Sequence, residues 1–167
     1  GMRLKETTVS YPRQLGLGAI QDNTLIYDMG KEIARQCRRL GVHVNFAPDA
    51  DINNNANNPV INTRSFGENR YNVLAKSAMY MRGMQDNNVM ACAKHFPGHG
   101  NTDMDSHKDL PTISGSASSL EELELYPFRQ MINQKGMVKN CLFLMFFIGF
   151  MHKNFPDQRC DGRGLYG

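Results

Sequence analysis

Segments with helical spacing of apolar residues alternate with short hydrophobic runs, and this alternation constrains the fold most. Helical spacing covers three segments, at about 22–40, 69–86 and 118–134. Short runs typical of strands lie between the helices, at 42–46 and 89–93. Helices that alternate regularly with strands predict an α/β fold with a parallel sheet.

The ends of the expected helices carry sequence signals. Asp22 or Asn23 is a suitable first cap, and Gly41 follows the same helix where a C-terminal glycine is common. The last helix is expected to begin at Ser118 or Ser119, since a glutamate follows each of them three residues later.

A long polar loop follows each expected strand. One runs from 49 to 64 and is rich in asparagine, which favours turns, and the other runs from 94 to about 115. Because loops at the carboxyl ends of parallel strands build the ligand sites of such folds, both loops are predicted to lie on one rim of the sheet.

Composition and residue spacing argue against several classes of function. Lys and Arg (19) exceed Asp and Glu (16) by only three, and no basic run is interleaved with aromatic residues, which disfavours nucleic-acid binding. The four cysteines form no CxxC pair, so neither a zinc ribbon nor a disulfide framework is expected. The apolar segment 141–151 is shorter than the roughly 20 residues of a membrane span, which favours a buried strand or helix.

Segment 94–109 contains three histidines and three aspartates, and three interpretations are open. Asp105 and His107 are spaced for a carboxylate–imidazole pair that performs acid/base chemistry. Alternatively, a metal site uses the three histidines, His95, His99 and His107, with Asp103 or Asp105, although the spacing matches no standard zinc motif. The third interpretation is that the histidines only brace a glycine-rich loop.

The first loop offers further polar candidates. Arg64 is either a planar donor for substrate hydroxyls or a carboxylate, or a bracing residue in a salt bridge to Asp51. Asp49 and Asp51 come just after a strand end, so they are candidates for the rim of a site, or they cap neighbouring backbone.

Several motifs together resemble one enzyme family over about residues 10–135. The motifs are KHFPGHG at 94–100 with Thr102, DSH at 105–107, LP at 110–111, NFAP at 45–48 with Asp51, NPVI at 58–61 and RSFG at 64–67. This combination is similar to bacterial glycoside hydrolase family 3, specifically its β-N-acetylhexosaminidase branch.

The resemblance implies a TIM-type (β/α)₈ barrel and a retaining mechanism without a metal or cofactor. It assigns His107 as the acid/base and Asp105 as the residue that orients it. It assigns Arg64, Lys94 and His95, with Asp51, to the terminal N-acetylglucosamine of a carbohydrate substrate such as a muropeptide. The implied compartment is either the bacterial cytoplasm or an exported location.

The chain also departs from the family pattern. A whole barrel takes roughly 250 residues, and neither the family's acidic N-terminal element nor its nucleophile loop has a counterpart here. We therefore expect residues 1–136 to be a barrel fragment, incomplete at both ends, and 137–167 to be a non-matching tail from a shifted reading frame or a disordered segment. Such a chain is predicted to be inactive alone and to self-associate through open sheet edges. A family 3 β-glucosidase and a non-catalytic carbohydrate-binding remnant are the alternative functions.

Overall fold

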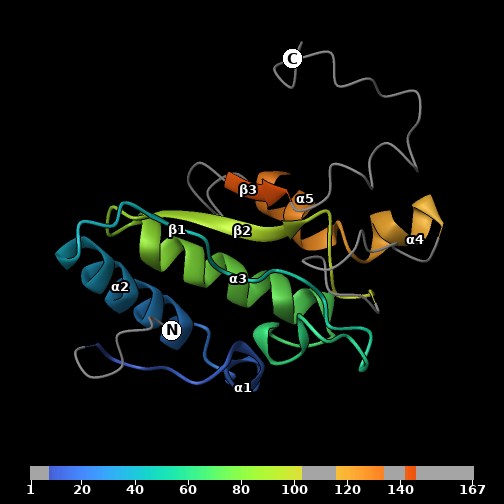
Figure 1. The fold of residues 1–167 in the computed structure, drawn as a ribbon, viewed down its shortest axis with the longest axis horizontal. Helices are drawn as coiled ribbons and strands as arrows, with labels where there is room; N and C mark the ends of the chain where they lie inside the picture. The colour runs from blue at the N-terminus through green and yellow to red at the C-terminus, as the bar shows by residue number, and fades with distance from the viewer. Residues whose placement is uncertain (1–7, 103–115, 134–141, 146–167) are drawn as a thin grey trace, which may run out of the picture.

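The computed structural model describes residues 8–102, 116–133 and 142–145. These residues form an α/β structure whose three strands are parallel and neighbour one another in chain order (Figure 1). The strands are β1 (Val44–Asn45), β2 (Met90–Phe96) and β3 (Leu142–Met145). The predicted α/β class with a parallel sheet is confirmed.

Five α-helices and one 3₁₀ helix are found among the described residues. They are α1 (Gln14–Gly18), α2 (Thr24–Arg39), η1 (Asn62–Arg64), α3 (Arg70–Gln85), α4 (Ala117–Glu122) and α5 (Tyr126–Asn133). Helices α2 and α3 lie side by side along the sheet (Figure 1), and α3 also contacts α5 and β2. This central position explains why α3 buries side chains around most of its circumference.

Two glycines allow α2 and α3 to approach closely. A Cβ atom on Gly83 would lie 2.2 Å from the carbonyl oxygen of Tyr27, and one on Gly30 would lie 2.5 Å from that of Tyr80. Any larger residue would therefore push the helices apart. The close contact fixes α3 beneath the strands whose ends carry the candidate site.

Apolar residues from the strands and helices form one core. It includes side chains of α2, α3, β2 and α5, among them Ile26, Ile33, Val73, Met81, Ala91 and Phe128. The helical spacing that predicted α2 and α3 corresponds to the faces buried in this core. Both helices are confirmed within two residues at each end, and Gly41 follows α2 with a φ of 72°.

The strand predictions were correct in position but not in extent. Strand β1 is shorter than the predicted 42–46, whereas β2 continues beyond the predicted Ala93 to Phe96. Lys94 and His95 therefore belong to the end of a strand instead of a loop. The backbone of Lys94 is hydrogen-bonded to Pro48 and Ala50, and the N–H of His95 donates to the carboxylate of Asp51.

The prediction of one helix over 118–134 was wrong, because the segment forms two helices. Pro127 lacks the N–H that would bond to the carbonyl of Leu123, and its ring disfavours a helix through that point. The first cap is Ser116, whose hydroxyl accepts from the N–H of Ser119 at 3.1 Å, so α4 begins before the predicted serines.

Other parts of the chain add to the sequence prediction. Helix α1 was not predicted, because a five-residue segment with two glycines has no helical pattern. Strand β3 lies within the apolar segment 141–151, where a strand or a helix was expected, and within the predicted non-matching tail. The domain boundary at residue 136 stays a prediction. No helix in the described part of the chain is long and apolar enough to cross a membrane.

Candidate active site

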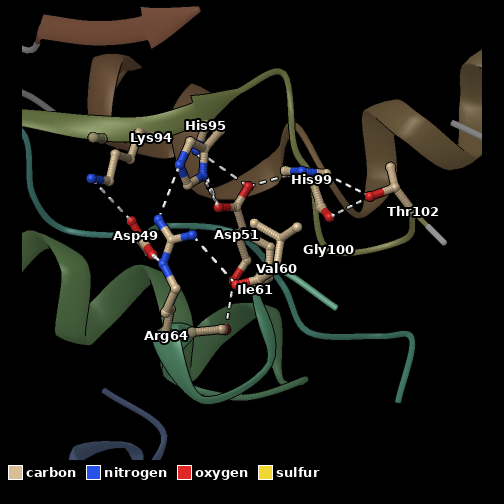
Figure 2. A network of polar contacts seen from close by, with 12 residues as sticks. Asp49, Asp51, Val60, Ile61, Arg64, Lys94, His95, His99, Gly100 and Thr102 are labelled. Carbon is tan, nitrogen blue, oxygen red and sulfur yellow. Dashed lines mark hydrogen bonds and ion pairs between the residues drawn. The ribbon is translucent and has the colours of Figure 1, made fainter. Parts of the chain in front are cut away.

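The loops after β1 and β2 lie side by side at the carboxyl ends of these strands. Asp49 and Lys94 form an isolated parallel bridge, with hydrogen bonds from Ala50 N to Lys94 O (2.6 Å) and from Lys94 N to Pro48 O (3.1 Å). The prediction that both polar loops share one rim is confirmed. Figure 2 shows the cluster of polar side chains that this pairing assembles.

The carboxylate of Asp51 is the centre of this cluster. Asp51 is fully buried, and its oxygens accept from the backbone N–H of His95 (3.2 Å) and of His99 (2.8 Å). Its Oδ2 also lies 2.6 Å from Nδ1 of the His95 ring. Three donors from β2 and the loop that follows it thus converge on one side chain after β1.

The contacts of His95 determine which ring nitrogen carries the proton. Nε2 lies 3.3 Å from Nη2 of Arg64, which only donates, so Nε2 accepts that hydrogen bond. Nδ1 then carries the hydrogen and donates it to Asp51. The ring is held from both sides in one tautomer and orientation (Figure 2).

Asp49 joins the two cations of the cluster. Its Oδ2 lies 2.8 Å from Nε of Arg64, and its Oδ1 lies 3.6 Å from Nζ of Lys94. Burial raises the pKa of the Asp49 carboxyl, and the nearby carboxylate of Asp51 adds to this rise, whereas the cations of Arg64 and Lys94 oppose it.

Exposure differs sharply between the anions and the cations. The side chains of Asp49 and Asp51 are 7% and 0% exposed, whereas those of Arg64 and Lys94 are 34% and 20% exposed. The carboxylates therefore lie behind the cations. The groups that face solvent at this rim are donors, suited to the oxygen atoms of a ligand.

The partner predicted for Arg64 was wrong. Arg64 forms its ion pair with Asp49, because the carboxylate of Asp51 is taken up by donors of His95 and His99. Asp51 still contributes to the loop of Arg64 through its backbone, since its carbonyl accepts a 2.6 Å hydrogen bond from the buried hydroxyl of Ser65.

His99 braces the loop after β2. It is 1% exposed, and its Nδ1 forms a short hydrogen bond with the hydroxyl of Thr102. The side chain of Asn58 donates to the carbonyl of His99 (2.6 Å) and accepts from the N–H of Ile61 (2.8 Å). The next residue, Gly100, packs so closely that a Cβ atom on it would lie 1.6 Å from the carbonyl oxygen of Ile52. The bracing interpretation therefore describes His99.

The predicted acid/base pair and the predicted metal site both depend on residues between 103 and 107. Asp105 and His107, the predicted acid/base pair, and Asp103 lie outside the described residues. Within the described residues, no group of three or more His, Cys, Asp or Glu side chains is arranged to hold a metal ion.

Two contributors, one half-buried and one buried, were missed by the sequence interpretation. Gln14 of α1 donates to the carbonyl of Asp49 (2.9 Å) and accepts from its N–H (3.2 Å). Glu124, between α4 and α5, is 4% exposed and accepts from the side chain of Asn54 (3.1 Å). Neither has a sequence signal, because both contacts join segments far apart in the chain.

The chain is similar in sequence to known proteins. The chain is 35% identical to beta-hexosaminidase A from Pseudoalteromonas piscicida over 80% of its length, and 35% identical to beta-hexosaminidase LpqI from Mycobacterium tuberculosis over 65%. These alignments cover 23% and 28% of the relatives, so the chain spans about a quarter of their length.

A solved structure and a family model agree with these relatives. The structure of a glycoside hydrolase family 3 beta-N-acetylglucosaminidase from Paenibacillus sp. superimposes with a TM-score of 0.77 and 42% identity, over 85% of this chain and 28% of that one. Residues 1–141 match the model of the glycosyl hydrolase family 3 N terminal domain. The chain therefore belongs to glycosyl hydrolase family 3.

Proposed function

We propose that this chain carries the sugar-binding part of the active site of a β-N-acetylhexosaminidase, and that the parent protein hydrolyses terminal β-linked N-acetylhexosamine. The observation that supports this is the convergence of Arg64, Lys94 and His95, whose polar ends meet at one rim and are backed by buried carboxylates. The names of the relatives, beta-hexosaminidase and beta-N-acetylglucosaminidase, agree with it.

Each of these residues has a proposed task. Arg64 and Lys94 donate hydrogen bonds to hydroxyl oxygens of the terminal sugar, since both cations are partly exposed. His95 supports Arg64 from behind, since its side chain is 4% exposed and its Nε2 accepts from Nη2 of Arg64. The Asp51 carboxylate, which is fully buried, acts through His95, because it fixes the orientation of the ring.

The chemical step in this proposal follows the retaining route. His107 protonates the leaving glycosidic oxygen and later removes a proton from water, and Asp105 orients its ring. A carboxylate nucleophile, for which this chain has no recognised motif, forms the glycosyl-enzyme. The natural substrates of the parent protein then include terminal N-acetylglucosamine units of cell-wall muropeptides.

We propose that the described elements belong to a partial TIM-type (β/α)₈ barrel. Three observations support this: the strands are parallel and adjacent in chain order, helices lie in each connection between strands, and α3 packs against both α2 and α5. The similarity to the Paenibacillus enzyme is consistent with this architecture.

We further propose that the chain self-associates through the edge of the sheet at β1. Val44 lies in β1, and Val42 and Phe46 lie just before and just after the strand; the three alternate along the chain and are 37%, 38% and 54% exposed. An edge strand with exposed apolar side chains is a template for pairing with another strand. The occupant that we propose is the same edge of a second copy, because it presents the same apolar row.

The experiment for this function measures the binding of two sugars and the hydrolysis of one substrate. Purified chain is titrated with N-acetylglucosamine and with glucose, and we expect binding to the first with weaker binding to the second. It is also incubated with an aryl N-acetyl-β-glucosaminide, and we expect no hydrolysis from the isolated chain. Equal affinity for both sugars would favour a β-glucosidase, and hydrolysis abolished by His107→Ala would show that the chain is active alone.

A further inference from the structure

We propose that Asp49 is a positioning residue that sets the orientation of Arg64 and Lys94 for the sugar. This inference rests on the proposed function, and it adds a residue to which the family resemblance gives no role. Asp49 does not itself reach the ligand side of the rim, because its side chain is 7% exposed.

The geometry divides the two oxygens of the Asp49 carboxylate between the two cations. Figure 2 shows Asp49 between the two cations. Oδ2 accepts from Nε of Arg64 (2.8 Å), and Oδ1 forms an ion pair with Nζ of Lys94 (3.6 Å). Using Nε for Asp49 leaves the outer nitrogens of the guanidinium for other partners. Nη2 reaches Nε2 of His95 (3.3 Å) and Nη1 reaches the carbonyl of Val60 (3.4 Å).

The position of Asp49 is set by its own backbone. The side chain of Gln14 accepts from the N–H of Asp49 and donates to the carbonyl of Asp49. The backbone bridge between Asp49 and Lys94 fixes this residue against β2. The carboxylate is therefore in place independently of the flexible side chains that it orients. This is the arrangement expected of a residue that preorganises a binding site.

Charge explains why a carboxylate is needed at this position. Arg64 and Lys94 are like charges that both approach residue 49, and without an anion between them they would repel each other. Asn at position 49 would keep the shape and one acceptor oxygen but would lose the charge. Its amide hydrogens would face one of the two cations. Asp49→Asn therefore tests the charge while it preserves the packing.

The test uses the whole chain, with Asp49→Asn and a matched control, Glu32→Gln. Glu32 forms an ion pair with Arg35 at 2.6 Å on the surface of α2, so the control removes an arginine-bound carboxylate elsewhere. Two quantities are measured: the hydrogen-exchange rate of the Arg64 Nε–H by nitrogen-resolved NMR, and the dissociation constant for N-acetylglucosamine. Circular dichroism checks that each variant is folded.

We expect Asp49→Asn to speed exchange at Arg64 Nε–H about tenfold and to weaken N-acetylglucosamine binding about tenfold, since a hydrogen bond to a charged group is lost. Glu32→Gln is expected to change neither quantity. Unchanged exchange at Arg64 in a folded Asp49→Asn variant overturns the proposal. So does sugar binding that the substitution leaves intact.

Two further comparisons distinguish a failure of the proposed function, or of folding, from a failure of the role proposed for Asp49. If the natural chain binds no N-acetylglucosamine, the proposed function fails, while exchange at Arg64 still decides whether Asp49 orients it. If Asp49→Asn does not fold, the natural chain alone supplies the answer, because Arg64 Nε–H should exchange about tenfold more slowly than that of the exposed Arg38. Equal exchange rates at Arg64 and Arg38 overturn the proposal.

Discussion

Oδ2 of Asp51 lies 2.6 Å from Nδ1 of His95, and the same carboxylate accepts from two backbone N–H groups of the following segment. The ring and the backbone around it are thus positioned by one buried side chain. This contact joins the segment after β1 to the end of β2, which are 44 residues apart in sequence.

Asp51→Asn is expected to lower the free energy of unfolding by about 3 kcal/mol, because the amide NH₂ would face donors in a buried site. Urea denaturation measures the change. The matched control is Asp22→Asn, beside the first cap of α2, where an exposed side-chain oxygen accepts from the N–H of Thr24 and asparagine keeps that acceptor. Equal losses in the two variants would contradict the central role of Asp51.

Gly100→Ala is expected to cost about 3 kcal/mol of stability, because its Cβ would lie 1.6 Å from the carbonyl oxygen of Ile52 and backbone must move. The control is Gly16→Ala in α1, where an added Cβ would meet a side-chain carbon of Pro12 at an ordinary contact distance of 3.8 Å. Thermal unfolding of both variants separates a steric cause from the general effect of replacing glycine. An unchanged melting temperature for Gly100→Ala would contradict the prediction.

The raised pKa of Asp49 predicts a specific pH dependence. A carboxyl whose pKa is higher in the folded state than the ordinary 3.8 favours folding below that value, and this contribution is lost as pH rises through the folded pKa. The free energy of unfolding of the natural chain, minus that of Asp49→Asn, should therefore fall as pH rises above 3.8.

Urea denaturation of both proteins across a pH series measures this difference. Asp51, His95, Arg64 and Lys94 face Asp49 and are present in both proteins, so their direct contributions largely cancel. A difference that rises with pH would mean that the cations outweigh the burial of Asp49.

Phe46→Lys is expected to shift the chain towards the monomer, because a charge on the edge of β1 opposes pairing with a second copy. Sedimentation velocity at several concentrations measures the shift. Ile132→Lys is the matched control, since Ile132 is 59% exposed on α5, away from the edge, and Phe46 is 54% exposed. Equal effects of both substitutions would point to general solubility in place of edge pairing.

Local patterns predicted those parts of the fold that depend on neighbouring residues. Helices α2 and α3 follow from apolar spacing, because the buried face repeats every helical turn. The shared rim of the two loops follows from the order of strands and helices. The break at Pro127 was also present in the sequence, but the apolar spacing that continues across it concealed the boundary.

The contacts within the candidate site were harder to predict. Arg64 had two acidic candidates nearby in sequence, and only the three-dimensional position of His95 and His99 decides that Asp51 is occupied and Asp49 is free to pair with it. The contact of Gln14 was harder still to predict, since Gln14 lies 35 residues before Asp49, whose backbone it binds. Such choices depend on competition between distant partners, which a sequence pattern does not contain.

The two anchors of the asparagine-rich loop have a practical consequence for protein engineering. Gly100 packs against Ile52 before the turn, and Asn58 is fastened to the opposite loop after it. Between these anchors, Ala56 and Asn57 are exposed. A peptide or reporter inserted between these two residues would leave both anchors in place, which makes this turn a suitable attachment point beside the rim of the candidate site.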